Sequence, residues 1–209
     1  EPDLHVHAFS PLELHHGAET LGLFIDDYLR ILIDAGLDTV PGTAAEILDD
    51  QVRAVICPDK LSAGQWLDTM EAAHRVGLRS TATIMFGHVD HAAHWATHLL
   101  AVRDLQVKTG GFTEFVPLPF VAREAPLYRR GQARPGPTRE ECRGMHAIAR
   151  IVLGDVIPNM PATSIWLPGS PARRPVFSAI CCAPASRPAP PAVASAPWPA
   201  PPPPPCAPP

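Results

Sequence analysis

The sequence predicts an α/β protein built around a parallel sheet. Strand-like and helix-like segments alternate through the first 155 of the 209 residues, which is the pattern of successive βαβ units. Serine or threonine precedes several of the helix-like segments, and glycine follows several of them, as is typical of helix ends. Polar residues gather where the expected strands end, which is the edge where β/α barrels carry their chemistry. Four strands would make about half of such a barrel, with open edges.

The chain is expected to begin with a strand, a helix and a second strand. Leu4–Phe9 alternates apolar residues with histidines, which indicates a strand. Leu21–Ala35 has apolar residues at helical spacing, and Gly36 would end this helix. Leu37–Val40 is the second expected strand.

Two helix starts are predicted from capping patterns. Residues 43–55 are expected to be helical, with Thr43 as N-cap and Glu46 three residues later. Ser62 would cap a helix over Ala63–Val76 in the same manner. The remaining expected elements are the strand Arg79–Phe86, the helix Asp90–Leu105, the strand Phe112–Val116 and the helix Thr138–Leu153.

Composition divides the chain into two parts, residues 1–157 and 158–209. All acidic residues and all histidines lie at or before Asp155, and 18 of the 27 prolines follow it. A Pro/Ala-rich segment buries too little apolar surface to offset its ordering entropy. We therefore expect residues 158–209 to be a disordered tail or the product of a shifted reading frame. The absence of a starting Met at Glu1 favours a truncated fragment.

The overall charge and the apolar runs exclude several classes of protein. The formal net charge is −4 and there is no basic stripe, which argues against nucleic-acid binding. No apolar run is long enough to span a bilayer, and neither GxGxxG nor GxxxxGK[ST] occurs. The five cysteines show no CxxC spacing, so we expect a reduced, cytoplasmic protein.

Histidines and carboxylates at the expected strand ends are the candidate functional residues. His5 and His7 would lie on one face of the first strand, where they could bind a metal, contact a substrate or serve only the structure. Glu46 lies at a strand-to-helix junction and could be a ligand residue or a capping partner. Glu114 lies within a strand, where an inward carboxylate is costly unless it binds something.

A second group of histidines follows the third expected strand. His91, His94 and His98 would share a helical face, with His88 and Asp90 before it. A zinc site is conceivable there, although such runs are more often a solvated face. Cys57 has no evident base beside it and is interpreted as structural.

Five blocks occur in order along the chain: His5–Glu13, Leu37–Asp49, Cys57–Leu61, Leu78–His88 and Gly110–Phe120. Together they resemble the tyrosine-utilising second module of FO synthase (7,8-didemethyl-8-hydroxy-5-deazariboflavin synthase), a radical SAM enzyme of deazaflavin biosynthesis. Radical SAM enzymes of the menaquinone pathway share the Pro-Gly-Thr-Ala-Ala-Glu pattern of residues 41–46, but Phe-Gly-His at 86–88 and Glu-Phe-Val-Pro-Leu-Pro-Phe at 114–120 favour FO synthase.

The resemblance implies a partial radical SAM barrel and a specific reaction. In the family, S-adenosylmethionine and a four-iron four-sulfur (4Fe-4S) cluster generate a radical that activates tyrosine. The hydroxybenzyl group of tyrosine is then joined to 5-amino-6-(D-ribitylamino)uracil, and a first module, expected to be fused upstream, closes the ring. By analogy, the substrates would lie near His5, His7, Ser10, Glu13 and Glu114, and S-adenosylmethionine near Gly42, Thr43, Glu46, Thr83 and His88.

Three departures from the family pattern matter. The CxxxCxxC loop that binds the cluster is absent, so the chain by itself is expected to be inactive. Asp90 stands where the family usually has glutamate. The likeness ends at Asn159, and the Pro/Ala-rich segment replaces the later barrel strands.

Two alternatives stay open. Residues 3–7, Asp-Leu-His-Val-His, resemble the first metal-binding strand of metal-dependent barrel hydrolases, with His5 and His7 as ligands. The other alternative is a non-catalytic interaction protein that uses its Pro-rich tail as a peptide ligand.

Overall fold

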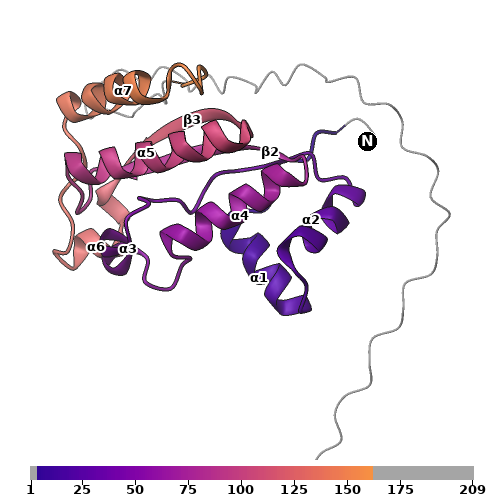
Figure 1. Cartoon of the computed structure of the whole chain (residues 1–209). Helices are drawn as coiled ribbons and strands as arrows, with labels where there is room; N and C mark the ends of the chain where they lie inside the picture. Colours follow the sequence, from indigo (N-terminus) through magenta and orange to yellow (C-terminus); the bar gives the residue numbers. More distant parts are fainter. Residues whose placement is uncertain (1–3, 162–209) are drawn as a thin grey trace, which may run out of the picture. The chain divides into compact units, whose positions relative to one another are not determined.

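The computed structural model describes residues 4–161, and these form an α/β unit around a parallel three-stranded sheet (Figure 1). The sheet has the order β1-β2-β3, with β1 at Thr39–Val40, β2 at Arg79–Phe86 and β3 at Phe112–Pro119. β1 pairs with β2, and β2 pairs with β3 along its whole length. The predicted α/β class is therefore confirmed.

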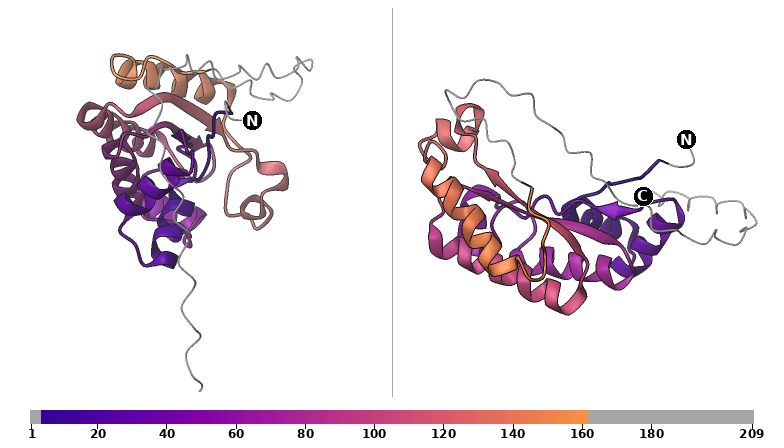
Figure 2. Two further views of the ribbon diagram at one scale, coloured as in Figure 1. Left: turned by 90° about the vertical axis from the view of Figure 1, so that its right-hand side faces the viewer. Right: turned by 90° about the horizontal axis from the view of Figure 1, so that it is seen from above.

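Helices α4, α5 and α7 lie on one face of this sheet (Figure 2): α4 and α5 contact β2, and α7 contacts β3. Helices α1 and α2 pack beside α4. This arrangement leaves the opposite face of the sheet without a helical layer in the described part of the chain. The helices are α1 (Pro11–Leu21), α2 (Ile25–Asp34), α3 (Asp50–Ile56), α4 (Ala63–Arg75), α5 (Ala92–Thr109), η1 (Ala122–Glu124), α6 (Pro126–Arg129) and α7 (Arg139–Leu153).

Local capping patterns fix the starts of several helices. Ser62 caps α4 and Thr138 caps α7, each through a complete capping box with the residue three positions later. Each hydroxyl accepts a backbone N–H that would otherwise lack a partner. The helices predicted at these two places are confirmed.

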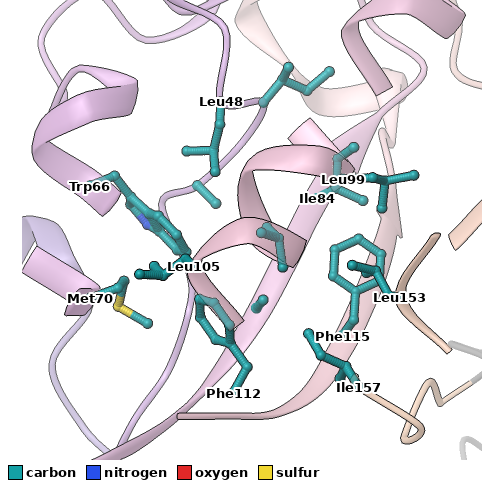
Figure 3. Close-up of a cluster of buried hydrophobic side chains, with 14 of the residues drawn as sticks. Leu48, Trp66, Met70, Ile84, Leu99, Leu105, Phe112, Phe115, Leu153 and Ile157 are labelled. Carbon is teal, nitrogen blue, oxygen red and sulfur yellow. The ribbon is translucent and has the colours of Figure 1, made fainter. Parts of the chain in front are cut away.

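The hydrophobic core lies between the sheet and the helices (Figure 3). Trp66 and Met70 from α4 are fully buried beside side chains of the sheet, such as Ile84 and Phe115. Leu99 reaches this layer from α5. Because β2 is the middle strand of the sheet, it is buried over most of its length.

Three sequence-based expectations about the first half differ from the structure. Leu4–Phe9 is not a full strand: it contributes one bridge, between His7 and Thr39, and a few backbone hydrogen bonds beside β1. The helix expected over Leu21–Ala35 is present as α2 but begins only at Ile25, because Leu21 belongs to α1, which ends at Gly22 in a left-handed conformation (φ 64°). Helix α1 itself was missed, although Ser10 and Glu13 form a capping box.

The third error concerns the segment after β1. The helix expected over residues 43–55 begins only at Asp50, with Asp49 as its N-cap. Ala44 and Glu46 have positive φ angles of 59° and 44°, which a right-handed helix does not allow. Residues 41–49 therefore form an irregular loop, and Glu46 is not a capping partner.

Among the residues that the structure describes, none of the helices has the length and apolar content needed to cross a membrane.

The expectation of a disordered or frameshifted tail concerns residues 158–209, and all but the first four of these lie outside the described range. Because Leu4–Phe9 forms only a bridge, the sheet in the described residues has three strands instead of the four expected, and the last expected strand is β3.

Candidate functional site

The face of the sheet opposite the helices collects several of the predicted site residues. Thr81 pairs with Glu114 and Thr83 pairs with Val116, so these side chains share a face. Their neighbours Ala82 and Phe115, also a pair, belong to the core on the other face. Because side chains alternate along a strand, the first set points away from the helical layer. Here we call it the inner face.

The first edge of the inner face carries two histidines that meet at one hydroxyl. His5 Nε2 lies 2.8 Å, and His7 Nδ1 2.7 Å, from Thr39 Oγ1. Partial burial lowers the pKa of His7, and the charge of His5 lowers it further. A neutral His7 can both donate and accept hydrogen bonds, so this corner can hold a polar, uncharged group. The sequence did not point to Thr39.

The loop of residues 41–49 is joined to the middle strand. Gly42 donates its N–H to Thr81 Oγ1 (2.8 Å), and Thr83 Oγ1 donates to the Gly42 carbonyl (2.7 Å). A Cβ at Gly42 would lie 2.0 Å from the Thr81 carbonyl oxygen, so only glycine fits. Two predicted site residues, Gly42 and Thr83, are thus in direct contact.

Glu46 is held at both its backbone and its side chain. Its carbonyl accepts the Met85 N–H (2.8 Å), and its carboxylate pairs with Lys60 Nζ at 2.7 Å. Its side chain is only 16% exposed. Thr43, in contrast, has an exposed side chain, and its carbonyl accepts the Trp66 Nε1 proton.

Two buried side chains, Arg53 and His98, bind the backbone of the loop of residues 41–49, a role that the sequence did not predict. Arg53 of α3 is 3% exposed and donates to the carbonyls of Leu61, Ala45, Ile47 and Ala44. His98 of α5 is fully buried, and its Nδ1 accepts the Leu48 N–H at 3.1 Å. The sequence singled out His98 only as a conceivable zinc ligand, and no pattern marks Arg53, because the partners of both residues are backbone groups.

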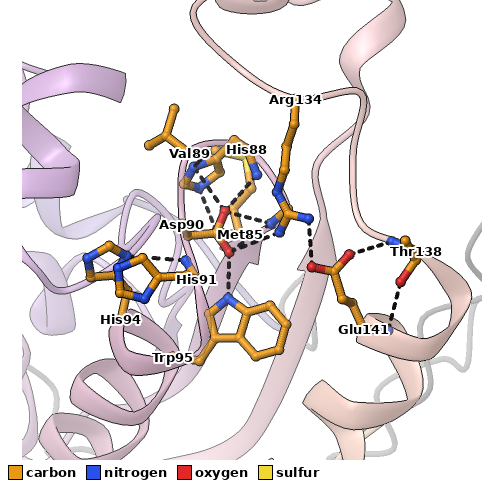
Figure 4. Close-up of polar contacts among 11 residues, drawn as sticks. Met85, His88, Val89, Asp90, His91, His94, Trp95, Arg134, Thr138 and Glu141 are labelled. Carbon is orange, nitrogen blue, oxygen red and sulfur yellow. Dashed lines mark hydrogen bonds and ion pairs between the residues drawn. The ribbon is translucent and has the colours of Figure 1, made fainter.

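The turn after β2 contains His88 and Asp90 (Figure 4). Asp90 is buried, and its carboxylate accepts the N–H groups of Gly87 and His88 and the Nε1 proton of Trp95. Burial alone would raise the pKa of Asp90, but these hydrogen bonds outweigh it and the pKa is lowered. Arg134 lies 3.9 Å from this carboxylate and joins it to Glu141 of α7.

His88 has both ring nitrogens occupied by neighbouring backbone groups. Nδ1 accepts the Val89 N–H at 2.7 Å, so Nε2 carries the proton that faces the Met85 carbonyl at 2.9 Å. Burial lowers the pKa of His88, despite the opposing charge of Asp90, and the ring is neutral. Within the described residues, these two hydrogen bonds fix the His88 ring in the turn after β2. S-adenosylmethionine is expected to bind near this turn.

Glu114 and Asn159 lie at the far edge of the inner face. Burial raises the pKa of Glu114. Asn159 Nδ2 donates to its carboxylate at 3.4 Å, and Phe115 donates its N–H to the Asn159 carbonyl. The chain after α7 therefore returns to the open side of β3, where a further strand of a parallel sheet would lie.

Ser10 and Glu13 have a local structural role. The Glu13 carboxylate accepts from both the N–H and the hydroxyl of Ser10, each at 2.7 Å. These hydrogen bonds lower the pKa of Glu13. Both residues cap α1, and their proposed contact with substrate stays a prediction.

The three histidines of α5 do not come together. His91 and His94 stack at the start of the helix, with ring centres 3.7 Å apart, whereas His98 is buried under the loop. Within residues 4–161, no group of three or more His, Cys, Asp or Glu side chains could hold a metal ion. The hydrolase alternative therefore gains no support from this part of the chain.

Comparison with known proteins gives the family. No protein-family model matches the chain. It is 56% identical over 152 residues, 73% of its length, to FO synthase of Mycobacterium leprae, of which it covers 18%. It is 51% identical over 166 residues, 79% of its length, to the 5-amino-6-(D-ribitylamino)uracil–L-tyrosine 4-hydroxyphenyl transferase of Methanothermobacter thermautotrophicus, of which it covers 45%.

These relatives are much longer than the part that they share with this chain. A second transferase of the same name, from Methanocaldococcus jannaschii, is 45% identical over 165 residues, and the chain covers 46% of it. The chain thus spans about a fifth of the FO synthases and less than half of the transferases. The resemblance seen in the sequence is confirmed: this chain is homologous to one segment of the FO synthase and tyrosine 4-hydroxyphenyl transferase family.

Proposed function

We propose that residues 4–161 supply part of the substrate- and cofactor-binding sheet of an enzyme that transfers the hydroxybenzyl group of tyrosine to 5-amino-6-(D-ribitylamino)uracil. The observation that carries this proposal is the 51% identity to a transferase of that name over 166 residues. The sheet supports it, because polar side chains of β1, β2 and β3 lie on the inner face, with His7 bonded to Thr39 at its first edge.

Each part of the inner face has a distinct binding role in this proposal. His5, His7 and Thr39 orient a polar group of one substrate through hydrogen bonds. Glu114, with its raised pKa, binds a polar group at the other edge and can exchange a proton more readily than an exposed carboxylate. Gly42, Glu46 and Thr83 hold S-adenosylmethionine, which supplies the radical when it is bound.

The described cysteines do not fit an iron–sulfur cluster. Such clusters need several thiolates, whereas Cys57 ends α3 and Cys142 lies in α7, both buried. Burial raises the pKa of each thiol. We therefore derive no step through the cluster, and we propose that a longer protein or a partner module supplies its ligands. Free buried thiols fit the reducing cytoplasm, where we place this protein.

A segment exchange tests the proposed function. The matched 152-residue segment of the Mycobacterium leprae FO synthase is replaced by that of this chain, and the hybrid is reconstituted anaerobically with iron and sulfide. Formation of the deazaflavin product is measured by chromatography. We expect at least a tenth of the parent activity, and at least a hundredfold loss in the Glu114→Gln hybrid.

A matched control separates chemistry from folding. Arg103 is exposed on α5 and pairs only with its neighbour Asp104, so the Arg103→Lys hybrid should keep the activity of the hybrid. A hybrid that folds and binds its cluster but forms no product would overturn the proposal.

A further inference from the structure

The loop of residues 41–49 adopts a conformation that its own sequence does not favour. Ala44 and Glu46 both have positive φ angles, a region that residues with a Cβ rarely occupy. Such strain persists only where the surrounding structure imposes it. Two buried side chains, Arg53 and His98, bind the backbone of this loop and impose its conformation.

Arg53 is the first of these groups. Its guanidinium is 3% exposed, and the partners found for it in the described part of the chain are all backbone carbonyl oxygens. Three of these carbonyls belong to the loop, at Ala44, Ala45 and Ile47. A guanidinium has five N–H donors in a fixed plane, and lysine cannot reproduce this fork. The carbonyls of the strained segment are thus drawn toward a single planar cation.

His98 is the second group. Its Nδ1 accepts the Leu48 N–H, which requires a ring that is not protonated at this nitrogen. Burial lowers the pKa of His98 to about 3, and the positive charge of Arg53 contributes to this shift. Arg53 therefore binds the loop directly, and its charge adds to the burial that keeps His98 neutral, as the second contact requires.

We propose that Arg53 is the positioning residue of this binding loop, holding residues 44–47 from beneath so that the Glu46 carboxylate and the Gly42 backbone face S-adenosylmethionine. This inference rests on the proposed function of the loop. Arg53 touches no ligand in this proposal: it acts through the backbone. Lys60 pairs with the Glu46 carboxylate at 2.7 Å and thereby orients the Glu46 side chain.

The test measures ligand affinity together with folding. The full 209-residue chain and its Arg53→Lys variant are titrated with S-adenosylmethionine by equilibrium dialysis, and both are followed by circular dichroism and by hydrogen exchange of residues 42–49. We expect Arg53→Lys to raise the Kd at least tenfold and to speed exchange of the loop amides, with the far-UV spectrum unchanged. Arg103→Lys, the exposed control on α5, should change none of these quantities.

A second pair of variants applies if Arg53→Lys does not fold. His98→Leu removes the acceptor of the Leu48 N–H, while His98→Asn can restore an acceptor oxygen near the position of Nδ1. We expect His98→Leu to raise the Kd at least fivefold and His98→Asn to bring it back within twofold of the unsubstituted value.

The outcomes separate the two proposals. A folded Arg53→Lys variant with a Kd within twofold of the unsubstituted chain would overturn the positioning role alone. Equal affinity of His98→Leu and His98→Asn would also overturn it. If the unsubstituted chain shows no binding of S-adenosylmethionine at millimolar concentration, the proposed cofactor role of the loop fails first, and the positioning role fails with it.

Discussion

Replacing Asp90 with asparagine would test how the turn after β2 is held. The carboxylate has two oxygens that accept from three donors: Oδ1 from Gly87 and His88, and Oδ2 from Gly87 and Trp95. Asparagine supplies one acceptor oxygen and one NH2 group. With its oxygen in the place of Oδ1, the NH2 group faces the Trp95 Nε1 proton, and one buried donor loses its partner.

The cost follows from these contacts. A buried donor left without a partner costs about 1–3 kcal/mol. The hydrogen bonds that remain become neutral, and charge-assisted bonds are roughly twice as strong as neutral ones, which adds about 1 kcal/mol. We expect Asp90→Asn to lower the free energy of unfolding by about 2–4 kcal/mol.

Urea unfolding followed by circular dichroism measures this loss, and a double-mutant cycle assigns it. Trp95→Phe removes the donor that asparagine would strand, so the two changes together should cost about 1–2 kcal/mol less than their sum. Asp104→Asn, at an exposed residue of α5, is the control and should cost less than 0.5 kcal/mol, as is usual at the surface. A loss below about 0.5 kcal/mol for Asp90→Asn, or strict additivity with Trp95→Phe, would refute the reasoning.

Three further predictions concern the core, the pH dependence and the cluster. Phe115→Ala should lower the free energy of unfolding by about 3–5 kcal/mol, because this ring is fully buried; an unchanged urea midpoint would count against the described core. Burial, with the charge of Arg79, lowers the pKa of His74 from 6.5 to about 4, so the unfolded state binds a proton that the folded state does not. The contribution of His74 should therefore be complete above about pH 6.5 and fall by roughly 2–3 kcal/mol toward pH 4; in urea titrations at several pH values, His74→Asn should reduce the slope by this amount and leave the part due to His98, whose pKa burial also lowers. The 209-residue chain alone should bind no stoichiometric 4Fe-4S cluster after anaerobic reconstitution; four irons per chain with cleavage of S-adenosylmethionine would contradict this.

Elements with local signals could be predicted from the sequence. The caps at Ser62 and Thr138 lie within one turn of the groups that they bind, so the starts of α4 and α7 are visible in the sequence. β2 is recognisable as a short stretch of apolar and threonine residues between two helical patterns. The missed helix α1 has the same kind of signal, since Ser10, Pro11 and Glu13 form a capping box with proline in the first turn.

The candidate site was predicted in part. The sequence pointed to His5, His7, Gly42, Thr83 and Glu114, and the register of the strands brings four of these to one face of the sheet, with Gly42 bonded to Thr83. Thr39 was missed because a threonine in a short strand has no distinctive pattern. Its role comes from two histidine rings that lie more than 30 residues away in the sequence.

The amino-acid sequence by itself determined the α/β class, the caps of α4 and α7, and the family, because these depend on local patterns or on blocks shared with related chains. Only the tertiary structure decided the conformation of residues 41–49. Helix propensity and the Thr43–Glu46 spacing favoured a helix there, but Arg53 and His98 bind the backbone of this loop from below. Several buried hydrogen bonds together outweigh a propensity of a few tenths of a kcal/mol per residue, and no local pattern shows which distant side chains will make them.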